Sequence, residues 1–137
     1  MRPLLLDTCT LIFMTGKARL AAAAVEGLHA ASEGGGITYI SPISAWEIGM
    51  LTARGRLQLL IRPERWFANL VEAPGVRLAE LSPDLLIASS YLPGRPPKDP
   101  TDRIVAATAR ELGATLITRG RALIDYGEQG HIAVLEC

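Results

Sequence analysis

The chain has 137 residues, of which 49% are hydrophobic and 20% charged, with 14 basic and 14 acidic side chains. This size and composition predict a single domain over residues 1–137 with a buried core, and they exclude a disordered or fibrous chain. A formal net charge of zero argues against a protein that coats nucleic acid by bulk attraction, although a local basic patch is compatible with it.

In the first half of the chain, short apolar runs alternate with helix-start signals. The expected elements are a buried strand at 4–6, a short helix at 8–14, an Ala-rich helix at 18–32 that ends at three glycines, and a strand at 37–40. Ser41-Pro42 then begins a helix that carries Trp46 and Glu47 and ends near Gly55. Arg62-Pro63 begins another, which carries Trp66 and Phe67. We expect Trp46, Trp66 and Phe67 to pack in the core.

The second half continues the alternation. It predicts a strand at 76–81, a helix from Ser82-Pro83 to about residue 92, a proline-rich loop at 93–98, a helix from Asp99-Pro100 to Leu112, and strands at 115–118 and 132–135. Strands that alternate with helices predict an α/β sandwich with a mainly parallel central sheet.

Nothing in the sequence indicates export or membrane insertion. Asp7 interrupts the N-terminal apolar stretch before a signal peptide could form, and no apolar run has the length of a membrane span. The two cysteines, Cys9 and Cys137, are too few for a disulfide framework. We therefore expect a cytoplasmic protein.

Three acidic residues lie among apolar neighbours, and no basic partner is obvious for any of them. They are Asp7 in PLLLDTCTLIF, Glu47 in ISAWEIGML and Asp102 in KDPTDRIVAATA. Burying an ionised acid without a partner costs several kcal/mol or more. If the fold brings the three together, repulsion raises their pKa values, and a divalent cation relieves it. A metal-dependent enzyme is the first hypothesis.

Each acid also has a simpler explanation. Asp7 and Asp99 are both good helix N-caps, and Asp102 stands at the position where a capping box places an acid. Glu47 lies about five residues inside its helix, too deep for capping, on a face that is largely apolar. It could still be half exposed, on the side of Ser44 and Arg54.

Basic residues are frequent around the last long helix. A positive patch beside an acidic cleft suits a phosphodiester substrate, and a solvated charged face is the alternative. The residues are Arg95, Lys98, Arg103, Arg110, Arg119 and Arg121. Among them, Arg103, Arg119 and Arg121 are candidates for positioning a nucleic-acid backbone.

Taken together, the motifs LLLDT, SPISAWEIGML and KDPTDRIVAATARELGATLITR, with the closing strand, resemble PIN-domain ribonucleases, and within them the VapC-type toxins of bacterial toxin–antitoxin operons. The resemblance implies a three-layer α/β/α sandwich with a Mg²⁺ or Mn²⁺ site. It implies that Asp7, Glu47 and Asp102 are catalytic and bind the metal, that Asp99 supports the metal from its edge, and that Thr8 is the hydroxyl residue beside the first acid.

The resemblance further implies cleavage of RNA, an antitoxin protein as partner, and a homodimer. One position departs from the family pattern: many relatives carry Asp or Asn after the LITR strand, where this chain has Gly120. Asp125 is five residues further on, and we do not assign it that role. The departure keeps open a catalytically weak or silent PIN-like interaction protein. A phosphatase of the haloacid dehalogenase type is disfavoured, because Cys9 stands where that chemistry needs a second Asp.

Overall fold

A computed structural model describes residues 2–15, 30 and 33–137 of the chain, so the helix expected at 18–32 lies almost wholly outside the described residues. Five strands form one sheet in the order β3-β2-β1-β4-β5, and all four of its pairings are parallel. The strands are β1 (Leu4–Leu6), β2 (Thr38–Ile40), β3 (Val76–Leu78), β4 (Thr115–Thr118) and β5 (Ala133–Glu136).

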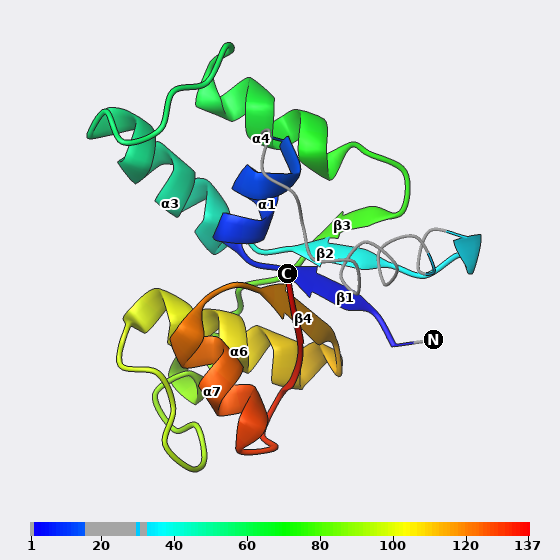
Figure 1. Ribbon diagram of the computed structural model, residues 1–137, viewed down its shortest axis with the longest axis vertical. Coiled ribbons are helices and arrows are strands. Elements are labelled where there is room, and N and C mark those ends of the chain that lie inside the picture. Colours follow the sequence, from blue (N-terminus) through cyan, green and yellow to red (C-terminus); the bar gives the residue numbers. More distant parts are fainter. Residues whose placement is uncertain (1, 16–29, 31–32) are drawn as a thin grey trace.

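Helices cover both faces of this sheet. They are α1 (Thr8–Thr15), α3 (Pro42–Ala53), α4 (Pro63–Val71), α5 (Pro83–Ala88), α6 (Pro100–Leu112) and α7 (Arg121–Glu128). Helices α1, α3 and α4 lie on one side of the sheet, and α6 and α7 lie on the other (Figure 1). The predicted three-layer α/β/α sandwich is confirmed. In the described part of the chain, no helix is long and apolar enough to cross a membrane.

Three helices begin where the sequence predicts, and for the predicted reason. The side chains of Ser41, Ser82 and Asp99 each accept a hydrogen bond from a backbone N–H of the following turn, and a proline occupies the first helical position. These caps satisfy N–H groups that the helix itself leaves unpaired. At the other end of α6, Gly113 adopts a left-handed conformation with φ of 60°.

The central strand β1 supplies both halves of the core, because alternate side chains point to opposite faces. Leu5, which is 0% exposed, packs with Ala106 of α6 and Tyr126 of α7. Leu4 and Leu6 pack on the other face, in a cluster bordered by Trp66 and Phe67 as expected. The strand is therefore buried on both sides, like the strands of other parallel sheets.

Some boundaries differ from the sequence predictions. Strand β3 ends at Leu78 rather than 81, because its neighbour β2 ends at Ile40, where α3 is about to begin. Helix α5 ends at Ala88 rather than near 92, and the carbonyls of the next two residues accept hydrogen bonds from Arg103 instead. Trp46 was expected in the core but is 57% exposed.

Helix α7 was missed by the sequence analysis. Its N-cap is Gly120, which offers no capping side chain, and it contains a further glycine, Gly127. A Cβ atom at Gly127 would lie 2.7 Å from Cγ2 of Val134 in β5, so close packing explains the glycine. Gly120 lies between the end of β4 and the start of α7. Because β4 is parallel to β1, Gly120 lies at the same edge of the sheet as Asp7.

Candidate active site

Asp7 is the most enclosed of the four predicted acids, at 6% exposed. It follows β1 and caps α1: its Oδ1 accepts from the backbone N–H of Thr10 at 2.9 Å and from the Thr10 hydroxyl at 2.8 Å. Its Oδ2 accepts from the Thr118 hydroxyl at the end of β4. The Cys9 thiol lies 3.1 and 3.3 Å from the two oxygens. The carboxylate is thus fixed by neutral donors, as buried charges require.

Glu47 lies half-buried on α3, and it reaches Thr8 across the space between two helices. The Thr8 hydroxyl lies 2.6 Å from Glu47 Oε1 and 2.9 Å from the buried Ser44 hydroxyl. Burial raises the pKa of Glu47, the hydrogen bond from Thr8 opposes this, and the negative charges of Asp99 and Asp7 raise it further. The Thr8 side chain, expected beside the first acid, thus contacts the second acid, Glu47.

Asp99 and Asp102 stand at the start of α6 and have opposite environments. Asp99 is exposed, and hydrogen bonds from Thr101 and from the backbone N–H of Asp102 lower its pKa. Asp102 is half-buried, and its pKa is raised to about 6, first by burial and then by the charges of Asp99, Glu47 and Asp7. Asp99 is therefore the N-cap, and Asp102 is the acid of this helix whose pKa is raised by the charges of Glu47 and Asp7.

The fold brings the four predicted acids into one electrostatic neighbourhood. Within the described residues, no Lys or Arg forms an ion pair with Asp7, Glu47 or Asp102. Across the same residues, no group of three or more His, Cys, Asp or Glu side chains is close enough together to hold a metal ion as a ready-made ligand set. Mg²⁺ usually keeps several waters and binds one or two carboxylates, so an open arrangement of oxygen donors still suits it.

Thr118 is a site residue that the sequence analysis overlooked. Besides donating to Asp7, its hydroxyl accepts from the backbone N–H of Gly120 at 2.9 Å. The signal was present in the strand register: Leu6 pairs with Ile117, so the residues that follow them lie side by side. Gly120 has no side chain, and the polar group that contacts Asp7 from the end of β4 is the hydroxyl of Thr118.

Asp125 does not replace an acid at position 120. It lies on the exposed face of α7, where its Oδ1 is 3.6 Å from Nε of Arg121. The sequence-based decision to leave it out of the site agrees with this position. Arg119 places its guanidinium 4.0 Å from the centre of the Phe13 ring, which is a cation–π contact.

Arg103 was a candidate for positioning a substrate backbone, and its contacts argue against that role. Its guanidinium donates to the carbonyl oxygens of Ser89 at 3.0 Å, Pro97 at 3.0 Å and Ser90 at 3.3 Å. The side chain thus ties together the two ends of the loop that precedes α6.

The comparisons with known proteins fit this arrangement. The family model for the PIN domain matches residues 4–129. The chain belongs to the PIN-domain family. The resemblance inferred from the sequence motifs is thereby confirmed.

Two kinds of relative stand out among proteins similar to this PIN-domain chain. Ribonuclease VapC22 of Mycobacterium tuberculosis (strain ATCC 25618 / H37Rv) is 34% identical over 105 residues, which cover 77% of this chain and 76% of that protein. Among solved structures, VapBC2 from Rickettsia felis, bound to a DNA fragment from its promoter, aligns with a TM-score of 0.69 at 14% identity over 98% of both chains. FitAcB from Neisseria gonorrhoeae aligns with a TM-score of 0.56 at 17% identity over 96% of both. At such identities the solved structures show a shared fold.

Proposed function

We propose that this chain is a metal-dependent endoribonuclease that acts as the toxin of a toxin–antitoxin pair. One structural observation carries the proposal: Asp7, Glu47 and Asp102 come from three separate parts of the fold, and burial, together with the charges of the neighbouring acids, raises the pKa of Asp102 to about 6. A fold that maintains such repulsion, with no Lys or Arg paired to these acids in the described part of the chain, is suited to binding a cation. The 34% identity to a protein named as a ribonuclease supports RNA as the substrate.

Asp7, Glu47 and Asp102 are the residues that would hold Mg²⁺ or Mn²⁺, with Asp99 at the edge. When bound, the ion supplies positive charge at the scissile phosphate and lowers the pKa of an attacking water. The chain's own part is positional. Hydrogen bonds to both carboxylate oxygens hold Asp7 rigidly, and Thr8 orients Glu47 toward the same space. Such fixed geometry is what metal-assisted phosphoryl transfer demands.

The decisive experiment measures cleavage of a mixed RNA pool with Mg²⁺, Mn²⁺ or EDTA by the wild type and by Asp7→Asn and Glu47→Gln. We expect cleavage by the wild type in either metal, none in EDTA, and a loss of at least about a hundredfold in both variants. Asp84→Asn, on the exposed first turn of α5, is the matched control and should cleave normally. Equal cleavage by wild type and Asp7→Asn would refute the proposal.

The partners follow from the same proposal. The solved neighbours include VapBC2 bound to promoter DNA and FitAB bound to a DNA fragment, which supports an antitoxin partner for this chain. We also propose a homodimer in the cytoplasm, built as a single domain. Exposed apolar side chains, Trp46, Ile87 and Tyr91 among them, offer surface for both contacts. Light scattering of the purified chain, with and without the protein encoded beside it, tests both.

The second candidate is a PIN-like interaction protein with little or no catalysis. It is favoured by Gly120, which leaves one flank of the site without an acid, and by the open spacing of the remaining carboxylates. Calorimetric titration with Mn²⁺ separates the two candidates. Binding that is lost in Asp7→Asn supports the nuclease, and no binding at millimolar Mn²⁺ supports the interaction protein.

A further inference from the structure

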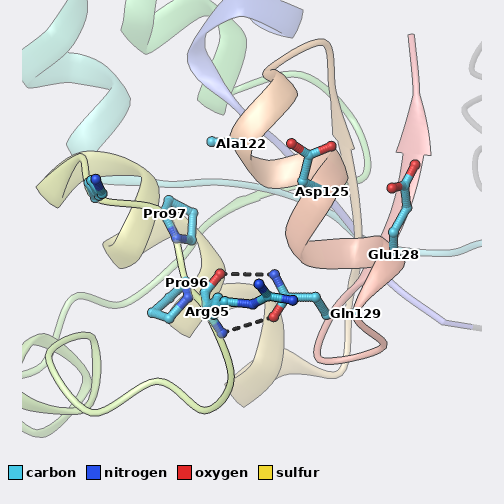
Figure 2. Close-up of a pocket in the computed structure, with 8 residues that line it drawn as sticks. Arg95, Pro96, Pro97, Ala122, Asp125, Glu128 and Gln129 are labelled. Carbon is cyan, nitrogen blue, oxygen red and sulfur yellow. Dashed lines mark hydrogen bonds between the residues drawn. The ribbon is translucent and has the colours of Figure 1, made fainter.

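A groove of about 550 Å³ lies outside the acid cluster, between the proline-rich loop and α7. Figure 2 shows its two walls: the loop carries Arg95, Pro96 and Pro97, and the helix carries Asp125 and Glu128. No part of the proposed metal chemistry uses these side chains.

The groove is held open by side chains that bind the main chain of the loop. Gln129 accepts from the backbone N–H of Arg95 and donates to its carbonyl, both at 2.9 Å, as the dashed lines in Figure 2 mark. The Tyr126 hydroxyl donates to the carbonyl of Pro93 at 2.7 Å. Gly94 must stay a glycine, because its φ is +71° and a Cβ atom there would lie 2.7 Å from Gln129 Oε1. The loop wall is therefore preorganised.

The two walls carry opposite charges. Arg95 and Lys98 on the loop are both exposed, and so are Asp125 and Glu128 on the helix. Two cations on one side favour the phosphates of a nucleic acid. On the other side Glu128 repels them, and Asp125, which has Arg121 3.6 Å away, repels them less. The carboxylates can instead accept hydrogen bonds from the amino groups of bases. A single strand would thus lie with its phosphates along the loop wall and its base edges along the helix wall.

The lining of the groove adjoins the predicted site in sequence at two places. Lys98 directly precedes Asp99 at the start of α6, and Ala122, which lines the groove, lies in the first turn of α7 after Gly120. The groove is therefore positioned by the same two chain segments, before α6 and at the start of α7, that carry Asp99 and Gly120.

We propose that this groove binds the single-stranded RNA that flanks the cleaved bond, with its phosphates on Arg95 and Lys98 and its base edges on Asp125 and Glu128. The inference rests on the proposed ribonuclease function and adds a subsite that selects bases. Bases with an exocyclic amino group, such as cytosine, bind better than uracil, which offers no such donor to a carboxylate.

The phosphate contacts are tested by binding, without turnover. A fluorescent ten-nucleotide oligo-C is titrated by anisotropy in EDTA with the wild type, Arg95→Ala and Lys98→Ala. Each variant should bind several-fold more weakly, and each lost contact should reduce the slope of log K against log salt by about 0.7. Arg77→Ala, on the exposed strand β3, is the matched control and should match the wild type. If Arg95→Ala and Lys98→Ala also match the wild type, the groove does not bind RNA.

The base contacts are tested by comparing oligo-C with oligo-U under the same conditions. The wild type should prefer oligo-C by at least about fivefold, within the range for one good carboxylate–base contact. Glu128→Gln should bind both strands more tightly, because repulsion is removed, and its preference should fall. Glu72→Gln, exposed at the end of α4, should keep the wild-type preference. Equal binding of the two strands by the wild type overturns the base assignment.

These outcomes are separable from failure of the proposed function. Should the chain fail to cleave RNA but bind oligo-C through Arg95 and Lys98, the nuclease is refuted and the groove stands. Should it cleave RNA while binding is unaffected by these variants, the groove is refuted and the nuclease stands.

Discussion

The hydroxyl of Thr8, at the start of α1, lies 2.6 Å from Oε1 of Glu47, midway along α3. This contact joins the first acid's neighbour to the second acid, across 39 positions of sequence. It stabilises the ionised form of a half-buried carboxylate whose pKa is raised by burial and by two other acids.

Replacing Thr8 by valine keeps its shape and removes this donor. A hydrogen bond to a charged group contributes about 1.5–3 kcal/mol, so we expect Thr8→Val to lower kcat/KM for RNA by roughly tenfold or more. The loss should grow as the pH falls, because removal of the Thr8 donor raises the pKa of Glu47 further. Thr8→Ser retains the hydroxyl and should stay close to the wild type. A Thr8→Val enzyme as active as Thr8→Ser would show that the contact is unimportant.

The raised pKa of Asp102 leads us to expect that the stability of the protein depends on pH. Its pKa in the folded state is about 6, above the ordinary 3.8, so the folded protein holds this proton more tightly than the unfolded chain. The stabilisation is present at low pH and is lost as pH rises from about 4 to about 6. In the absence of metal, Asp102→Asn should therefore be more stable than the wild type at pH 7.5, by about 1 kcal/mol after allowance for solvent screening.

Thermal unfolding in EDTA at pH 4 and pH 7.5 checks this prediction. The gain in Tm should be a few degrees at pH 7.5 and should vanish at pH 4. Saturating Mn²⁺ should reverse the order, since only the wild type keeps the full set of acids. A variant less stable than the wild type at pH 7.5 in EDTA contradicts the assigned repulsion.

Thr118 is expected to matter for stability as well as for the site. Thr118→Val removes the hydroxyl that donates to Oδ2 of Asp7 and leaves the backbone N–H of Gly120 without its acceptor. Among the described residues, the Cys9 thiol, 3.3 Å away, is the remaining side-chain donor to Oδ2. A buried group left unsatisfied costs about 1–3 kcal/mol, and the urea midpoint should fall accordingly. Thr118→Ser keeps the hydroxyl and should lose less than half as much. If serine is no better than valine, the hydroxyl is not what stabilises this strand end.

Substitutions of Arg103 can distinguish a structural role of this side chain from a role in substrate binding. Its fork reaches three carbonyls of the loop that precedes α6, a geometry that lysine cannot reproduce. We expect Arg103→Lys and Arg103→Met to lower Tm by similar amounts, and the salt dependence of RNA binding to stay unchanged in both. A phosphate contact would give the opposite pattern, in which lysine substitutes well and methionine reduces the salt slope.

The sequence predicts most of what local chemistry determines. Capping depends on a few neighbouring residues, so the helix starts at Ser41, Ser82 and Asp99 can be predicted from the sequence. Strand β1 can be predicted because it is a continuous apolar run. Asp7, Glu47 and Asp102 could be singled out because an acid among apolar residues is costly wherever the chain folds. Their mutual repulsion is an expectation that the structure supports.

The sequence is less informative where the role of a residue depends on packing against a residue that is distant in the chain. Helix α7 lacks a capping side chain, and its Gly127 makes sense only once Val134 of β5 lies against it. Its apolar positions Leu123, Ile124 and Tyr126 are buried at helical spacing, a pattern too short to be decisive beside two glycines. Trp46 looks like a core residue by type, but its place on α3 leaves it exposed.

The sheet order has a consequence for how the protein is made. Because β1 lies between β2 and β4, Asp7 receives its contact from Thr118 only after 111 further residues have been synthesised. Pairings between such distant segments form late in folding. A nascent chain therefore carries its first acid long before it carries a formed site. Any activity that needs a rigidly held Asp7 is therefore withheld on the ribosome until β4 has been synthesised.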